Sequence, residues 1–132
     1  MNNEKLLTYI DRPTLDKYLY FQGLRVPGGE LVSIITPTNK PLYLNNIFTN
    51  YLNQSYHNKE LIIILNNNQL NLQEWMNYAK AFEQVRIYQL DQTITLGECL
   101  NYGIMQARGR YLARFDDDDY YGFHYLADAV TC

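Results

Sequence analysis

Four adjacent aspartates, Asp116–Asp119, are the residues of this sequence whose types and spacing most clearly suggest chemistry. They directly follow the apolar run "RYLARF", so the carboxylates stand where an extended segment ends. Two carboxylates about 5 Å apart repel each other by roughly 3 kcal/mol at an effective dielectric constant near 20. Water, a helix N-terminus or a bound cation must offset this repulsion, and the run alone leaves all three open.

The spacing of the aspartates suggests how they would share a ligand. Residues two apart in an extended segment face the same way, which would direct Asp116 and Asp118 to one ligand and turn Asp117 and Asp119 elsewhere. Mg²⁺ and Mn²⁺ prefer carboxylate oxygens, often together with substrate phosphates. The alternative is a solvated loop that favours the N-terminus of the next helix, and we expect Asp119 to have that role.

Strand-like runs and helical patterns alternate along most of the chain. The predicted strands and helices, in order, are residues 31–36, 44–52, 60–65, 72–79, 85–90, 96–107, 110–115 and 123–130. Pro37 is expected to end the first strand, and Thr95 with Glu98 forms a capping box for the third helix. This alternation predicts an α/β fold with a mostly parallel, Rossmann-like sheet and helices on both faces.

The predicted topology also indicates where a ligand would lie. In open parallel sheets, ligands bind beyond the carboxyl ends of the strands. Three polar loops leave those ends, at residues 37–39, 66–68 and 116–119. We therefore expect these loops to converge on one site.

Composition and charge exclude several classes of protein. The chain has 132 residues, of which 47% are apolar, and a net charge of −3, so we expect one domain and no nucleic-acid partner. The longest wholly apolar run, residues 61–65, is too short to span a membrane. Cys99 and Cys132 form no metal or redox pair by their spacing, which favours a cytoplasmic setting.

Three stretches of residues 31–130 resemble, in the family's own order, the donor-binding half of family-two glycosyltransferases with the GT-A fold. They read "VSIITPTNKP", "YLNQSYHNKELIII" and "LGECLNYGIMQARGRYLARFDDDD". The first is similar to the family's first strand and nucleotide loop, the second to its helix-to-strand passage, and the third to the run that leads into its Asp-x-Asp motif. The resemblance implies a hexosyltransferase type of enzyme that uses a nucleotide-diphosphate sugar, most often UDP-linked, with Mn²⁺ or Mg²⁺.

The resemblance also implies roles for individual residues. Those expected to contact the nucleotide sugar are Pro37, Thr38, Asn39, Asn66, Asp116 and Asp117. Asp118, together with Asp116, is expected to bind the metal. Asn66 stands where the family commonly has an aspartate that contacts the uracil, so an uncharged amide would contact the base here.

The resemblance covers only part of a complete transferase. Residues 1–30 are expected to be an N-terminal extension with short helices around residues 4–10 and 14–22, and residues 31–132 an incomplete GT-A domain. The half that supplies the glycan or lipid-linked acceptor site and the catalytic base is expected to be missing. We therefore assign no catalytic residue and expect no sugar transfer by this chain alone. We expect the chain to bind the donor for glycan or cell-surface polymer synthesis, and to self-associate or be unstable in isolation. The alternatives are a non-catalytic GT-A-like binding or interaction module and an unrelated doubly wound protein.

Overall fold

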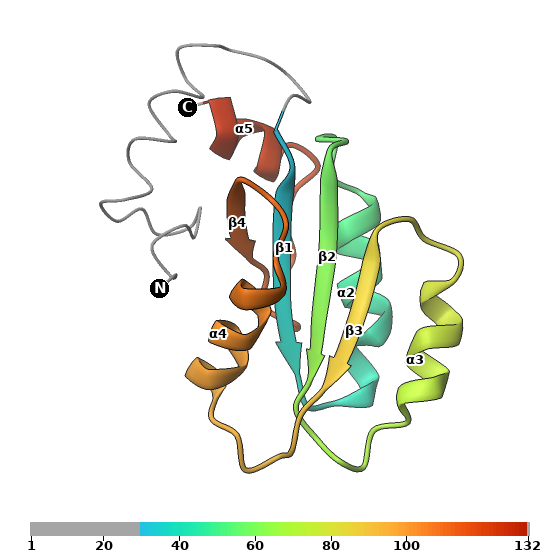
Figure 1. The fold of residues 1–132 in the computed structure, drawn as a ribbon. Helices are drawn as coiled ribbons and strands as arrows, with labels where there is room; N and C mark the ends of the chain where they lie inside the picture. The colour runs from blue at the N-terminus through green and yellow to red at the C-terminus, as the bar shows by residue number, and fades with distance from the viewer. Residues whose placement is uncertain (1–29, 132) are drawn as a thin grey trace.

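A computed structural model describes residues 30–131 and shows a single sheet with helices on both of its faces (Figure 1). The elements are β1 (Val32–Thr38), η2 (Pro41–Tyr43), α2 (Leu44–Leu52), β2 (Lys59–Leu65), α3 (Leu72–Ala79), β3 (Val85–Gln89), α4 (Leu96–Gln106), β4 (Tyr111–Arg114) and α5 (Tyr125–Thr131). The helices expected around residues 4–10 and 14–22 lie outside the described residues. Among residues 30–131, none of the helices has the length and apolar character that crossing a bilayer requires.

The four strands form a parallel sheet in the order β3-β2-β1-β4. Ile34 of β1 lies opposite Leu61 of β2 and Ala113 of β4, which sets the register of the centre. All seven residues of β1 and six of the seven in β2 are buried, as expected for strands covered on both faces. Because every strand runs the same way, their carboxyl ends meet at one edge of the sheet, the lower edge in Figure 1.

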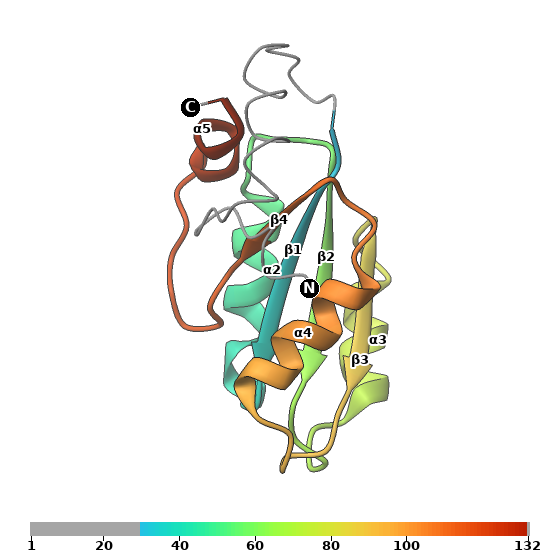
Figure 2. The same ribbon diagram turned by 60° about the vertical axis from the view of Figure 1, so that its left-hand side comes forward.

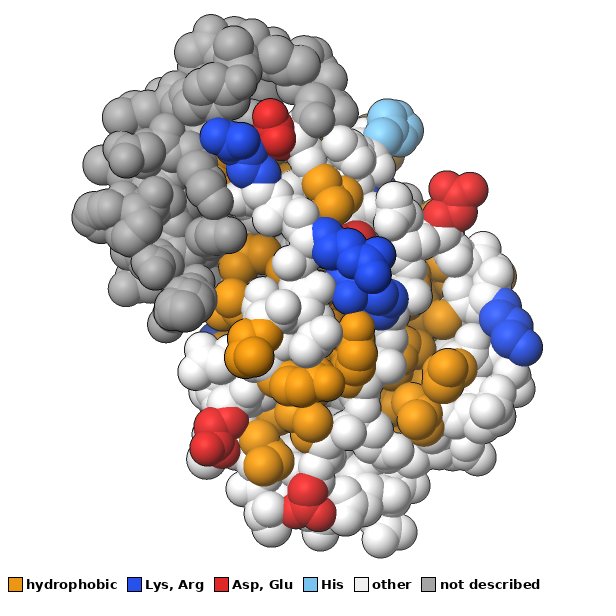
Figure 3. Space-filling view, in the orientation of Figure 1, with side chains coloured by type: hydrophobic (Ala, Val, Ile, Leu, Met, Phe, Trp, Pro, Cys, Tyr) orange, Lys and Arg blue, Asp and Glu red, His pale blue; other side chains and the backbone are white. Residues whose placement is uncertain are grey.

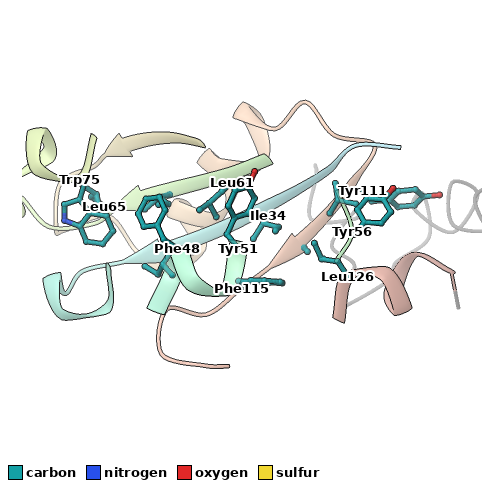
Figure 4. Close-up of a cluster of buried hydrophobic side chains, with 14 of the residues drawn as sticks. Ile34, Phe48, Tyr51, Tyr56, Leu61, Leu65, Trp75, Tyr111, Phe115 and Leu126 are labelled. Carbon is teal, nitrogen blue, oxygen red and sulfur yellow. The ribbon is translucent and has the colours of Figure 1, made fainter. Parts of the chain in front are cut away.

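Helices cover the two faces of the sheet unequally (Figure 2). Side chains alternate along β2, so that Leu61, Ile63 and Leu65 join the core under α2, α3 and α5, while Ile62 and Ile64 join the core under α4. The larger core also holds Ile34, Phe48, Tyr51, Trp75, Tyr111, Phe115 and Leu126 (Figure 4). The predicted sheet with helices on both faces is therefore confirmed.

The second core, which contains Ile62 and Ile64, is smaller than the first. Among the described residues, α4 is the one helix that covers it. Figure 3 shows hydrophobic side chains gathered over this face of the molecule. The hydrophobic residues that pack against this core and are only partly buried include Tyr88 of β3 and Leu100 and Tyr102 of α4. Consequently β3, the outer strand next to β2, is half-buried along its whole length.

Two glycines let α4 and the turn after it approach the sheet closely. A Cβ atom on Gly103 would lie 2.6 Å from the Ile35 side chain, and one on Gly109 would lie 2.5 Å from Ser33 Oγ and 2.7 Å from the Leu31 carbonyl oxygen. The Gly109 N–H also donates a hydrogen bond of 2.8 Å to Ser33 Oγ. A larger residue at either position would push β4 or α4 away from β1.

Pro37 does not end the first strand, contrary to our prediction. β1 continues through Thr38, and Pro37 lies opposite Ile64 of β2. The last pair between β1 and β4 joins Ile35 to Arg114, so the β4 side of β1 has no strand partner at Pro37. Since successive residues turn their N–H groups to opposite sides, the N–H that proline lacks would point to that open side.

Candidate donor-binding site

The carboxyl ends of β1, β2 and β4 border a pocket of about 350 Å³. Its walls come from the end of β1, the first residue after β2, the first residue of α4 and the segment that follows β4. The lining residues are Pro37, Thr38, Asn39, Asn66, Leu96, Arg114, Asp116, Asp117 and Asp118. The structure thus brings together all seven predicted site residues and adds Leu96 and Arg114, which were not predicted.

The aspartate run has a different conformation from the one we expected. β4 ends at Arg114, and Asp117 and Asp118 form a turn, so the run is not extended. The prediction that Asp117 faces elsewhere is therefore wrong, because Asp117 lines the same pocket as Asp116 and Asp118. Asp119 does not line the pocket, although its carboxyl interacts with that of Asp116.

The expected role of Asp119 at the start of the last helix is also wrong. α5 begins at Tyr125, six residues after Asp119, and not at residue 123 as predicted. The segment between them folds back instead. Its Tyr121 ring stacks on Phe115 with 3.9 Å between ring centroids, and the Tyr121 hydroxyl accepts a hydrogen bond of 2.8 Å from the Asp116 N–H.

The carboxylates of the run differ in their partners. Asp117 Oδ2 accepts a hydrogen bond of 2.7 Å from Thr38 Oγ1 at the end of β1, and Asp116 Oδ1 pairs with Arg114 Nε at 3.0 Å. The side chain of Asp118 forms no hydrogen bond or ion pair with the described residues. Asp118 is therefore the pocket carboxylate with the most freedom to take an external ligand.

The electrostatics of the run favour a cation. The pKa of the Asp119 carboxyl is raised, first by its hydrogen bond with Asp116, then by desolvation and by the negative charges of the other aspartates. The part of this rise that comes from the neighbouring negative charges is the part that a bound cation would offset. Among residues 30–131, no three acidic, histidine or cysteine side chains are placed to hold a metal ion by themselves. The donor set suits Mg²⁺ or Mn²⁺, which commonly take one or two carboxylates and complete their coordination with substrate phosphates and water.

Asn66 presents one free acceptor in the pocket. Its Nδ2 donates a hydrogen bond of 3.1 Å to the Ile94 carbonyl, which fixes the orientation of the amide. Its Oδ1 is buried and has no partner among the described residues. A buried acceptor without a partner costs free energy, so a ligand N–H at this point would bind favourably.

Three amide side chains along α2 and just beyond its end hold the backbone of the aspartate run. They are Asn46, Asn50 and Gln54, spaced four residues apart and so on one face of the helix. Asn46 Nδ2 donates to the carbonyl oxygens of Asp117 at 2.7 Å and Asp119 at 2.9 Å, and Asn50 Nδ2 donates to Asp119 at 2.8 Å.

The same amides also hold the segment that leads to α5. Asn50 Oδ1 accepts a hydrogen bond of 3.0 Å from the Tyr121 N–H, and Gln54 Nε2 donates to the Gly122 carbonyl at 2.9 Å. Gln54 Oε1 accepts from the Leu126 N–H at 2.9 Å. Neutral amides thus fix the loop by its backbone, and the carboxylates keep their charge for the pocket.

We expect Asn50→Ala to destabilise the protein by about 2 kcal/mol, because it leaves the Tyr121 N–H without its acceptor and removes one of the two hydrogen bonds to the Asp119 carbonyl. Asn50 is 2% exposed, so water cannot replace the lost amide without rearrangement. Urea unfolding measures the difference. Asn53→Ala, an exposed position just after α2, is the matched control and should stay within about 0.5 kcal/mol of the wild type. Equal stability of the two variants would contradict the assigned role of the amides.

Comparison with known proteins identifies the family. Residues 33–131 match the sequence model of glycosyl transferase family 2. The chain belongs to this family. It is 33% identical over 95 residues to WcaA of Escherichia coli strain K12, described as a glycosyl transferase of colanic acid biosynthesis, and the match covers 70% of this chain and 34% of WcaA.

Solved structures support the same fold. The S. aureus protein TarS 1-349, solved in complex with UDP-GlcNAc, aligns with a TM-score of 0.66 and 22% identity over 74% of this chain and 29% of that chain. A mannosyltransferase from Pyrobaculum calidifontis, in complex with GDP-Man and Mn²⁺, aligns with a TM-score of 0.59 and 18% identity over 87% of this chain and 37% of that chain. The predicted GT-A fold is thus confirmed for this family 2 glycosyltransferase domain, which spans about a third of the length of these relatives.

Proposed function

We propose that this family 2 domain binds a nucleotide-diphosphate sugar, UDP-linked, in the pocket at the carboxyl ends of β1, β2 and β4. The observation that carries the proposal is the convergence of the β1 end, Asn66 and the three aspartates 116–118 on that pocket. The pocket offers a fixed acceptor for a base and carboxylates for a cation that would accompany the diphosphate. TarS and the mannosyltransferase, solved with UDP-GlcNAc and with GDP-Man and Mn²⁺, are consistent with such a ligand.

Asp118 and Asp116 would hold the divalent cation, Mn²⁺ or Mg²⁺. When bound, such a cation neutralises the charge that develops on a departing diphosphate. Asp117 keeps its bond to Thr38 and so joins the metal-binding turn to the nucleotide loop of β1. Pro37 and Asn39 flank Thr38 in that loop and would border the nucleotide.

Asn66 would select the base. One N–H of its Nδ2 is committed to the Ile94 carbonyl, whereas its Oδ1 has no partner among the described residues and can only accept. Uracil presents an N3–H donor, whereas cytosine presents an N3 acceptor at the same place. The proposed site therefore favours UDP over CDP.

The wider activity we propose is transfer of a hexose to a glycan or lipid-linked acceptor, in glycan or cell-surface polymer synthesis. We assign no catalytic base among residues 30–131, so the proposed contribution of this chain is donor binding, with the acceptor site supplied by a further part of the transferase. Transfer by this chain alone is not expected. A cytoplasmic location and self-association stay predictions.

Calorimetric titration of the protein with UDP and with CDP, each with and without Mn²⁺, tests the proposal. We expect UDP to bind only weakly without Mn²⁺, and to bind about 10- to 100-fold more tightly than CDP with it, because CDP forfeits the bond to Asn66 Oδ1. Asn66→Ala should bring the two affinities close together. Absence of UDP binding in both conditions would refute the proposed function, whereas equal affinities in the wild type would refute only the base selection.

A further inference from the structure

Arg114 is the one cationic side chain among the described residues that line the pocket. It is the last residue of β4, and its Nε lies 3.0 Å from Asp116 Oδ1. Both side chains are partly exposed, at 36% for Arg114 and 43% for Asp116, so the pair lies at the mouth of the pocket and not in the core. An ion pair of this exposure contributes little to folding and can exchange partners readily.

The pairing leaves most of the hydrogen-bonding capacity of Arg114 unused. A guanidinium has five N–H donors, and the pair with Asp116 uses the one on Nε. Nη1 and Nη2 form no hydrogen bond with residues 30–131. Their fork geometry suits two oxygens of one phosphate, which a lysine ammonium cannot match.

The negative charge of the pocket suggests what the unpaired Nη groups of Arg114 could do. Three carboxylates line the pocket with Arg114, so a diphosphate meets a net negative wall unless cations offset it. Asp116 has two possible counter-ions, the Arg114 guanidinium and a divalent cation. Each lowers the affinity of Asp116 for the other, because both are attracted by the same carboxylate charge.

We propose that Arg114 is a donor-binding residue that exchanges partners. Without metal it neutralises Asp116. With metal on the carboxylates it presents its Nη donors to a phosphate oxygen of the nucleotide sugar. This inference rests on the proposed function. It goes further by assigning a second cationic contact to the diphosphate and a competition between Arg114 and the metal.

The proposal predicts effects of opposite sign for Arg114→Gln. The variant should bind Mn²⁺ alone about 3- to 10-fold more tightly than the wild type, because a competing positive charge is gone. It should bind UDP at saturating Mn²⁺ about 10- to 100-fold more weakly, because a charge-assisted contact is lost. Uridine, which has no phosphate, should bind both proteins equally. A purely structural role for Arg114 would weaken the binding of all three ligands together.

Two measurements resolve these effects. Electron paramagnetic resonance of free Mn²⁺ gives the metal affinity, and calorimetry at saturating Mn²⁺ gives the affinities for UDP and uridine. Arg108→Gln is the matched control, since Arg108 is exposed in the turn before β4 at the other end of that strand. Arg114→Lys keeps the charge without the fork, and should lose UDP affinity by less than Arg114→Gln while binding Mn²⁺ as the wild type does.

The outcomes separate this inference from the proposed function. UDP binding by the wild type that is unchanged in Arg114→Gln would overturn the role of Arg114 and leave the proposed function standing. A parallel loss of Mn²⁺ and UDP affinity in Arg114→Gln would also overturn it. If Arg114→Gln is unfolded, Arg114→Lys provides the test. UDP affinity of Arg114→Lys equal to that of the wild type would refute the proposed contact between the two Nη groups and a phosphate. A wild type that binds no UDP refutes both proposals.

Discussion

Replacing Asp118 by asparagine is expected to weaken Mn²⁺-dependent binding of UDP by about 100-fold, as for a lost metal ligand. Asp118 lines the pocket, and its carboxylate has no hydrogen bond or ion pair with the described residues, so its removal breaks no internal contact. Asparagine keeps the shape and removes one charged oxygen. Calorimetric titration with UDP at saturating Mn²⁺ measures the loss, and the weak affinity without metal should not change.

Stability provides an independent check on Asp118→Asn. One carboxylate of a crowded run is lost, so the metal-free variant should unfold at a temperature no lower than the wild type. Asp119→Asn is the matched control: its carboxyl does not line the pocket, so UDP affinity should fall by less than about 3-fold. The metal assignment fails if Asp118→Asn binds UDP with Mn²⁺ as tightly as the wild type, or no more weakly than Asp119→Asn.

Replacing Glu60 by glutamine is expected to cost about 3 kcal/mol of stability, the usual result of breaking a buried ion pair on one side. Glu60 is 1% exposed at the start of β2. Its carboxylate accepts hydrogen bonds from Ser33 Oγ at 2.6 Å, from Arg86 Nη2 at 2.7 Å and from the Arg108 N–H at 2.8 Å. Glutamine cannot accept all three bonds and leaves Arg86, which is 22% exposed, without a counter-charge.

The same network makes stability depend on pH. Burial alone would raise the pKa of Glu60, but the hydrogen bonds from Ser33, Arg108 and Arg86 and the Arg86 charge outweigh it and lower the pKa from its usual value. A lowered carboxyl pKa stabilises the fold above the unfolded-state pKa, and this stabilisation disappears as pH falls through the folded-state pKa. The wild type should therefore lose stability below about pH 5, and Glu60→Gln should lose less.

Urea unfolding between pH 3 and pH 7 tests this account of Glu60. Glu83→Gln, an exposed position before β3, is the control and should follow the wild-type pH profile. Glu60 sits at the amino end of β2, far from the pocket at the carboxyl ends, so UDP affinity should be unchanged in folded Glu60→Gln. A variant as stable as the wild type at pH 7 would show that the pair with Arg86 contributes nothing.

Local signals predicted most of the fold. The apolar runs of β2 and the capping box of Thr95 and Glu98 depend on neighbours within a few residues, and both occur where expected. Convergence of the three polar loops follows from parallel strand direction, so the pocket could be located from topology. Seven of its nine lining residues were predicted without knowledge of side-chain contacts, whereas Leu96 and Arg114 were not.

The conformation of the aspartate run could not be predicted, because its determinants are distant in sequence. Asn46 and Asn50 bind the loop across about 70 residues, and nothing in the run itself indicates that it turns. Pro37 is tolerated in β1 only because β4 is short, which is a property of another element. Arg114 was the one omission with a local signal, since a residue two positions before Asp116 in an extended segment shares its face.

Paramagnetic broadening by Mn²⁺ in the presence of UDP tests most directly whether this pocket binds a diphosphate together with a divalent cation. Nuclear magnetic resonance of the ¹⁵N-labelled protein with UDP and Mg²⁺ supplies the reference, and small amounts of Mn²⁺ are then added. We predict that the amide signals of Thr38, Asn39, Asp117 and Asp118 broaden first, while that of Arg108 at the other end of the sheet stays sharp. Broadening centred elsewhere, or equal at all of these positions, would contradict the account.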